Sequence, residues 1–236
     1  MGETGVNEEF FARRAAARAR LDAIDPHKRA GGATADPQRK DWFEAVYRLA
    51  EGDAANVPWA NLAPHPLLAD WLATRRLDHL RALDIGCGLG DNAEALAAAG
   101  ARVTAFDLVE NAVAWAKRRF PRSAVDYRAA DLFAAPPEWR GGFDLVHECY
   151  TLQALPDSLL DEAAQALASL IAPGGLLLVI ARARDEGQEV AGPPWPLPPS
   201  RIAALAVGGL RCETLEDIPA TDAMVRHWRA AFRRDG

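Results

Sequence analysis

Three glycines that follow a hydrophobic segment are the residues of this chain best suited to hold a ligand. The segment at 81–85 leads into Gly86, Gly88 and Gly90. Glycine lacks Cβ, so its backbone can approach a ligand closely. Asp107 ends the next hydrophobic segment, where a carboxylate can accept hydrogen bonds from both ribose hydroxyls of a nucleoside. Together these residues predict a nucleoside-binding cleft; the alternative is a tight turn beside an incidental aspartate.

The spacing of the glycines distinguishes between nucleoside cofactors. The loop reads G-x-G-x-G, and Asp91 stands where the third glycine of the nicotinamide-binding pattern G-x-G-x-x-G belongs. This difference favours S-adenosylmethionine, with S-adenosylhomocysteine as its product, and hence a methyltransferase. A nicotinamide-dependent oxidoreductase and a regulatory protein that binds S-adenosylmethionine without turnover are the alternatives.

A second acidic position fits the base of the same nucleoside. Ala130, Asp131 and Leu132 follow the third predicted strand. The aspartate can accept a hydrogen bond from the exocyclic amine of adenine, with Leu132 or Phe133 against the ring. The alternative is that Asp131 caps the start of a helix.

Polar residues after the fourth predicted strand are candidates for the reaction itself. Glu148 ends this strand, so it can bind the cofactor, orient a neighbour or accept a proton from the nucleophile. His147 should point to the opposite side of the sheet and pack there. Tyr150 and Gln153 can form hydrogen bonds in the cleft, whereas Cys149 is expected to pack. Glu148 and Tyr150 are therefore the predicted catalytic residues.

Alternating strands and helices must position these residues. Short apolar strands separated by helices predict a parallel sheet covered on both faces. Pro173–Gly175 is expected to make a tight turn into the fifth strand, and the last two strands lack a helix between them, which predicts an antiparallel hairpin. Strands are expected at 81–85, 102–106, 124–128, 143–149, 176–181, 210–217 and 224–233. Helices are expected at 7–24, 41–51, 67–74, 91–99, 110–119, 157–171 and 200–207, with a loop at 25–39.

Residues 80–181 resemble the core of class I S-adenosylmethionine-dependent methyltransferases. The resemblance rests on LDIGCGLG at 83–90, the acid Asp107, the Ala130–Leu132 segment and PGGLLLVI at 173–180. It implies an α/β fold, a Rossmann-like, doubly wound sheet of seven strands in the order 3-2-1-4-5-7-6 with strand 7 antiparallel. We expect residues 67–236 to form this domain and residues 1–66 to form an N-terminal helical lid.

The segment from Trp42 to Trp71 resembles, more loosely, the lead-in of thiopurine and thiol methyltransferases. Trp42, Pro58–Trp59 and His65–Leu68 carry this resemblance, but Ala60–Leu62 departs from it. The resemblance implies a small-molecule acceptor, with a thiol of natural-product or xenobiotic metabolism as first choice and an oxygen or nitrogen nucleophile as the alternative.

Trp42 and Trp59 can cover the sulfonium by cation–π contact and exclude water; the alternative is ordinary packing. Arg182 can hold an acidic group of the acceptor, or it can be a solvated charge. The residues expected to bind the cofactor are Trp42, Trp59, Asp84, Gly86, Cys87, Gly88, Asp107, Leu108, Asp131, Leu132 and Glu148. The residues expected to contact the acceptor are Trp59, His65, Tyr150, Gln153, Arg182 and Trp195.

Composition narrows the class of protein. The net charge of −6 and the lack of a basic run argue against a nucleic-acid partner. Three separated cysteines, out of 236 residues, predict neither a disulfide framework nor a metal site. No segment approaches the roughly 20 apolar residues that span a bilayer, and the N-terminus does not read as a secretory signal. We expect a cytoplasmic monomer or homodimer.

Overall fold

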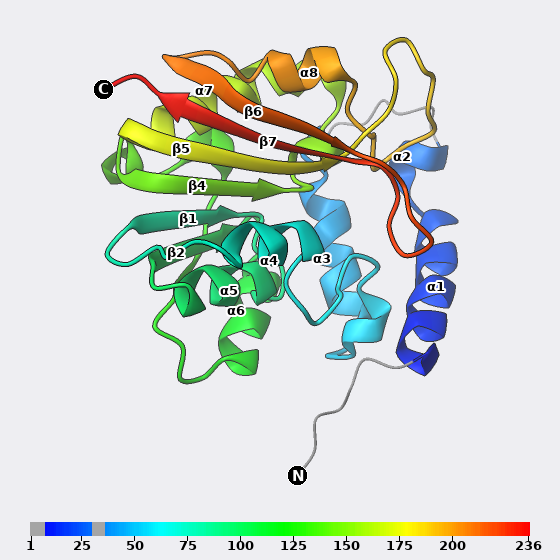
Figure 1. The fold of residues 1–236 in the computed structure, drawn as a ribbon. Coiled ribbons are helices and arrows are strands. Elements are labelled where there is room, and N and C mark those ends of the chain that lie inside the picture. Colours follow the sequence, from blue (N-terminus) through cyan, green and yellow to red (C-terminus); the bar gives the residue numbers. More distant parts are fainter. Residues whose placement is uncertain (1–7, 30–35) are drawn as a thin grey trace.

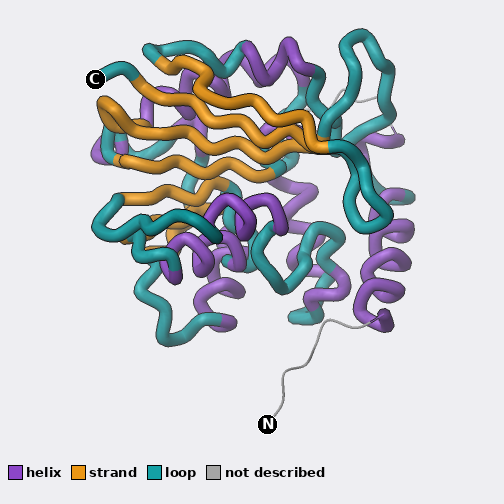
Figure 2. The backbone as a smooth tube through the Cα atoms, viewed as in Figure 1, coloured by secondary structure: helices purple, strands orange, loops and turns teal. Residues whose placement is uncertain are grey.

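Seven strands form one mixed sheet in the computed structural model, which describes residues 8–29 and 36–236. The strand order is β3-β2-β1-β4-β5-β7-β6 (Figures 1 and 2). β1 to β5 run parallel, and β7 is antiparallel to both β5 and β6. The predicted fold class, strand order and antiparallel seventh strand are confirmed. The strands are β1 (Arg81–Ile85), β2 (Arg102–Asp107), β3 (Asp126–Ala129), β4 (Phe143–Cys149), β5 (Ile171–Arg182), β6 (Leu210–Ile218) and β7 (His227–Arg234).

Helices cover both faces of the sheet, because residues along each buried strand alternate between two apolar clusters. Val146 packs with Leu167 of α7 on one face, and Leu145 packs with Leu96 of α5 on the other. The helices are α1 (Glu8–Asp22), α2 (Pro26–Arg29), α3 (Lys40–Leu49), α4 (Pro66–Leu72), α5 (Asp91–Ala98), α6 (Glu110–Arg119), α7 (Leu160–Leu170) and α8 (Pro199–Ala203).

Two local predictions were wrong. Pro173–Gly175 does not turn ahead of the fifth strand but lies within β5, which starts at Ile171. Gly174 adopts φ 72°, and the pairing of β4 with β5 shifts register nearby, so the glycine accommodates an irregularity of the strand. The predicted loop at 25–39 contains the short helix α2, while its residues 30–35 lie outside the described part of the chain.

The N-terminal helices lie at the carboxyl edge of the parallel strands. Figure 1 shows α1 and α3 beyond the ends of β1 and β4, beside the loop that joins β6 to β7. In α3, Phe43, Val46 and Tyr47 follow helical spacing and face inward. Tyr47 packs with Leu89 of the glycine loop and Trp115 of α6, so α3 is fixed directly above the loop.

No helix in residues 8–29 and 36–236 is long and apolar enough to cross a membrane. Nor do the described His, Cys, Asp and Glu residues include a group of three or more that could hold a metal ion.

Candidate active site

The glycine loop turns sharply between β1 and α5. Gly86 and Gly90 have φ values of 63° and 92°, a backbone region that residues with Cβ rarely occupy. A Cβ at Gly86 would lie 2.4 Å from the Thr151 hydroxyl oxygen, and one at Gly90 would lie 2.5 Å from the Tyr127 hydroxyl oxygen. The loop therefore needs glycine for both its conformation and its close packing.

Asp107 fixes this loop from the end of β2. Its Oδ2 accepts a hydrogen bond from the Gly88 N–H at 2.9 Å, and its Oδ1 accepts one from the Val109 N–H at 3.0 Å. Burial raises the pKa of Asp107 to about 6, although these N–H groups oppose the shift. The carboxylate can accept further hydrogen bonds, for example from hydroxyl groups of a ligand.

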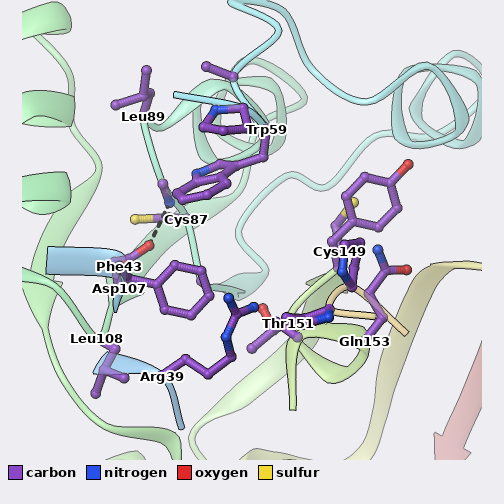
Figure 3. A pocket seen from close by; sticks show the side chains of 18 of the residues that line it. Arg39, Phe43, Trp59, Cys87, Leu89, Asp107, Leu108, Cys149, Thr151 and Gln153 are labelled. Carbon is purple, nitrogen blue, oxygen red and sulfur yellow. Dashed lines mark hydrogen bonds between the residues drawn. The ribbon is translucent and has the colours of Figure 1, made fainter. Parts of the chain in front are cut away.

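A cavity of about 390 Å³ lies between the carboxyl edge of the sheet and the N-terminal helices. Figure 3 shows its two sides, with Asp107, Cys87 and Trp59 on one and Thr151, Cys149 and Gln153 on the other. The cavity brings together most of the site residues expected from sequence. Those that line it are Trp42, Trp59, His65, Gly86, Cys87, Gly88, Asp107, Leu108, Leu132, Tyr150, Gln153 and Arg182.

Aromatic residues of the lead-in close the side above the glycine loop. The Trp59 indole N–H donates to the Tyr47 hydroxyl at 3.0 Å, and its ring meets Phe43 edge-on at 5.4 Å. Phe43 and Tyr47 also line the cavity, although sequence reasoning did not select them. Their four-residue spacing on one helix face was the available signal.

Asp131 and Trp195 do not line the cavity. Asp131 caps a short 3-10 helix, since its Oδ1 accepts from the Phe133 N–H at 2.9 Å, and its Oδ2 accepts from the Gln38 side chain at 3.2 Å. The Trp195 ring packs against Gly192, while the Trp195 backbone N–H donates to the Gln153 carbonyl at 2.7 Å. Asp131 therefore holds Phe133 and Gln38, and Trp195 holds Gln153; these three partners line the cavity.

Asp84 and Glu148 lie beneath the cavity and do not line it. Glu148 is fully buried, and its Oε1 accepts hydrogen bonds from the N–H groups of Thr151 at 2.6 Å and Leu152 at 3.0 Å. Burial raises its pKa to about 7. Asp84 meets the buried His147 ring at 2.7 Å, which agrees with the expected packing role of His147. These acids support the walls of the cavity.

Three polar rings meet on the side of the cavity that His65 and Tyr150 line. The Tyr150 hydroxyl lies 2.9 Å from His65 Nε2 and 2.6 Å from His227 Nε2. Tyr150 has φ 73°, a strained conformation for a tyrosine, and such strain is concentrated at functional sites. His227 was not predicted from sequence, because it begins β7 and is 77 residues from Tyr150. No motif marks it.

Comparison with known proteins points to one kind of domain. Residues 82–175 match the family described as "Methyltransferase domain", and the sheet order and glycine loop agree with that match. This part of the chain is therefore similar to a methyltransferase domain.

Two curated relatives of the chain are named as O-methyltransferases. The ubiquinone biosynthesis O-methyltransferase of Xanthomonas campestris pv. campestris (strain B100) is 39% identical over 120 residues, which are 50% of this chain and 49% of the relative. That of Aromatoleum aromaticum is 40% identical over 114 residues, 47% of this chain and 48% of the relative. The chain thus spans about half the length of the curated relatives it matches.

Two solved structures are similar over a larger part of this chain than the curated relatives are. N-methyltransferase NodS from Bradyrhizobium japonicum WM9, in complex with S-adenosylhomocysteine, is 26% identical with a TM-score of 0.62 over 81% of this chain and 99% of NodS. The Burkholderia thailandensis 1,6-didemethyltoxoflavin-N1-methyltransferase shares the fold at 18% identity, with a TM-score of 0.66 over 90% of this chain and 91% of that one.

Proposed function

We propose that the chain transfers the methyl group of S-adenosylmethionine to a hydroxyl oxygen of a small molecule. One observation carries the choice of oxygen. Tyr150 lines the cavity and its hydroxyl is hydrogen-bonded to two imidazoles, so a proton acceptor is built into the acceptor side. The relatives named as ubiquinone biosynthesis O-methyltransferases support this proposal, although they match only half their length. A thiol, the first choice from sequence, has no such need because its thiolate is already partly populated near neutral pH.

The residues of the cavity fit the cofactor. Asp107 lines the cavity, and its carboxylate can accept hydrogen bonds from two ribose hydroxyls, while Leu108 and Leu132 offer apolar surface for the adenine ring. Trp59 and Trp42 lie where aromatic faces would shield a sulfonium from water. When bound, S-adenosylmethionine supplies the electrophilic methyl group.

Backbone contacts define the direction of proton movement. His65 Nδ1 accepts the Leu67 N–H at 3.2 Å, so Nε2 carries the proton and donates to the Tyr150 oxygen. His227 Nδ1 donates to the Val225 carbonyl at 2.5 Å, so His227 Nε2 is an acceptor and receives the Tyr150 hydroxyl. A proton lost by the acceptor hydroxyl can therefore pass to the Tyr150 oxygen as the tyrosine proton passes to His227.

Burial keeps both imidazoles neutral for this task. It lowers the pKa of His227, and it lowers that of His65 to about 3. His227 is thus uncharged near neutral pH and can accept a proton. Glu148 has a positioning role in this scheme, because its bonds to Thr151 and Leu152 hold the turn that follows Tyr150.

We also propose that residues 1–66 act as the lid of a domain formed by residues 67–236; residues 1–7 and 30–35 lie outside the described chain. The described part of this segment supplies the outer wall of the cavity. Arg18 of α1 donates to the Pro58 carbonyl at 2.8 Å, which ties α1 to the loop that carries Trp59. The lid would keep water away from the reacting atoms.

An acceptor panel tests the proposal. Purified protein is given S-adenosylmethionine and matched phenols, thiophenols and anilines, and methylated products are measured by mass spectrometry. We expect turnover of phenols, and Tyr150→Phe should lower their kcat/KM by about 100-fold or more, which is the usual contribution of general base catalysis. The affinity of Tyr150→Phe for S-adenosylhomocysteine, measured by calorimetry, is the control and should be unchanged, because the substitution removes only the hydroxyl that bonds His65 and His227.

Exclusive turnover of thiols or amines would contradict the oxygen assignment. A lack of turnover with every class, together with tight S-adenosylhomocysteine binding, would favour the non-catalytic binding protein.

A further inference from the structure

The charges around the cavity do not balance. Four acids line it, and three of them already have a cationic partner. Asp22 pairs with Lys28 at 2.9 Å, Asp25 with Arg39 at 2.5 Å and Asp91 with Arg119 at 2.7 Å. The fourth, Asp107, is held by backbone N–H groups at the cofactor end.

Three arginines of the lining are not held in a salt bridge by any described acid. Arg14, Arg18 and Arg182 form no ion pair within residues 8–29 and 36–236. Arg14 and Arg18 lie one turn apart on α1, and each donates to a backbone carbonyl of the loop at 58–61. Arg182 ends β5 on the other side, and its Nε is buried with no hydrogen-bond partner in the described chain.

These guanidinium groups lie close enough to affect one another, and two of them lie near Tyr150. Burial lowers the pKa of Arg14 and of Arg18, and the charge of Arg182 lowers both further, while Asp22 opposes the shift of Arg18. The Arg182 guanidinium carbon is 5.5 Å from the centre of the Tyr150 ring, and the charges of Arg182 and Arg18 both oppose the rise that burial causes in the pKa of Tyr150. Like charges in a partly buried wall repel one another, and an anion between them would remove that repulsion.

We propose that Arg14, Arg18 and Arg182 form a carboxylate-binding subsite for the methyl acceptor, so that the acceptor is a hydroxylated organic acid. This inference rests on the proposed function and deepens it. Guanidinium groups bind carboxylates through paired N–H donors, which gives orientation as well as affinity. A carboxylate held beside Arg182 would place the remainder of the acceptor next to the Tyr150 hydroxyl.

The carboxylate of S-adenosylmethionine is the other possible source of this chemistry, and binding measurements separate the two. In the first arm, calorimetry compares S-adenosylhomocysteine with methylthioadenosine, which lacks the amino acid carboxylate. We expect Arg182→Gln and Arg18→Gln to change the affinity for both compounds less than threefold. A loss of affinity for S-adenosylhomocysteine alone would assign the arginines to the cofactor and overturn the proposal.

In the second arm, protein saturated with S-adenosylhomocysteine is titrated with acids and their matching amides. The pairs are benzoate and benzamide, 3,4-dihydroxybenzoate and its amide, and 3,4-dihydroxycinnamate and its amide. We expect at least one acid to bind tenfold more tightly than its amide, and Arg182→Gln to remove that preference. Equal binding of acid and amide in every pair, or a preference that survives Arg14→Gln, Arg18→Gln and Arg182→Gln, would overturn the proposal.

Matched variants protect this interpretation. Arg76→Gln removes an exposed arginine that pairs with Asp78 at 3.1 Å away from the cavity, so it should leave the acid preference unchanged. Arg18→Lys keeps the positive charge, so this variant should retain most of the preference for the acid over its amide. Thermal unfolding of each variant verifies folding. This titration measures binding and not turnover. If an acid binds through the arginines but no panel compound is methylated, the carboxylate subsite stands and only the proposed function is rejected.

Discussion

Replacing Glu148 by glutamine distinguishes a positioning role from proton abstraction. The Glu148 carboxylate is fully buried and accepts two backbone hydrogen bonds through Oε1, while Oε2 has no partner among the described residues. A glutamine carbonyl can accept the same two bonds, whereas alanine would leave two buried N–H groups unpaired. At about 1–3 kcal/mol for each such group, Glu148→Ala should lose about 2–6 kcal/mol of unfolding free energy.

The titration of Glu148 gives this prediction a pH signature. Its pKa rises from 4.5 to about 7 on folding, so the folded protein binds this proton more tightly than the unfolded chain. The stability it contributes is complete below pH 4.5 and is lost as the pH rises through 7. Over pH 5 to 8 this loss amounts to about 2–3 kcal/mol, and glutamine does not titrate.

Urea unfolding of the ligand-free proteins at pH 5 and pH 8 measures the effect. Relative to the unsubstituted protein, Glu148→Gln should gain about 2–3 kcal/mol over this range, since groups common to both proteins cancel. Its kcat for the best phenol of the panel should stay within about threefold of the original. A 100-fold loss of kcat with unchanged stability and S-adenosylhomocysteine affinity would show that Glu148 is the base, and the reasoning from its burial would be wrong.

Three further substitutions or conditions test other parts of the site. His227→Gln should remove the acidic limb of the kcat/KM pH profile, which lies below the ordinary histidine pKa because burial lowers the pKa of His227; a profile identical to the original would exclude its role with Tyr150. S-adenosylhomocysteine should bind more weakly by calorimetry below pH 6, because Asp107, whose pKa is about 6, accepts ribose hydroxyls best when ionised; Asp107→Asn should remove this dependence, and its persistence would count against the contact. Gly90→Ala should destabilise the fold by about 1–3 kcal/mol in urea unfolding, since it combines φ 92° with a Cβ 2.5 Å from the Tyr127 hydroxyl; unchanged stability would refute the strain argument.

The sequence predicted the sheet well because local patterns encode it. Strand β1, the glycine loop and Asp107 follow one another within 27 residues, and the structure places Gly88 and Asp107 in the lining of one cavity. Side-chain direction was harder to predict. The position of Glu148 at the end of β4 was correct, but nothing in its spacing shows that the carboxylate turns back to bind Thr151 and Leu152.

Contacts between distant segments were the least predictable. His65 was selected from a resemblance, whereas His227 and the arginines of α1 were not selected at all. Their roles depend on where the last strand and the first helix reach the cavity, and no local pattern carries that information. Arg182 was selected because it lies at the carboxyl end of the fifth strand, which is a local signal.

The antiparallel direction of β7 has a consequence for how the two sides of the cavity are assembled. Because β7 runs opposite to β5, its first residue, His227, pairs with the last residue of β5 at the carboxyl edge. On one side of the cavity Gly88 contacts Asp107, 19 residues away in the chain, and on the other Tyr150 contacts His227, 77 residues away. The longer loop costs about 1 kcal/mol more in chain entropy. The side around Asp107 can therefore organise early from nearby segments, whereas the side around Tyr150 is complete only once both ends of the described chain have docked.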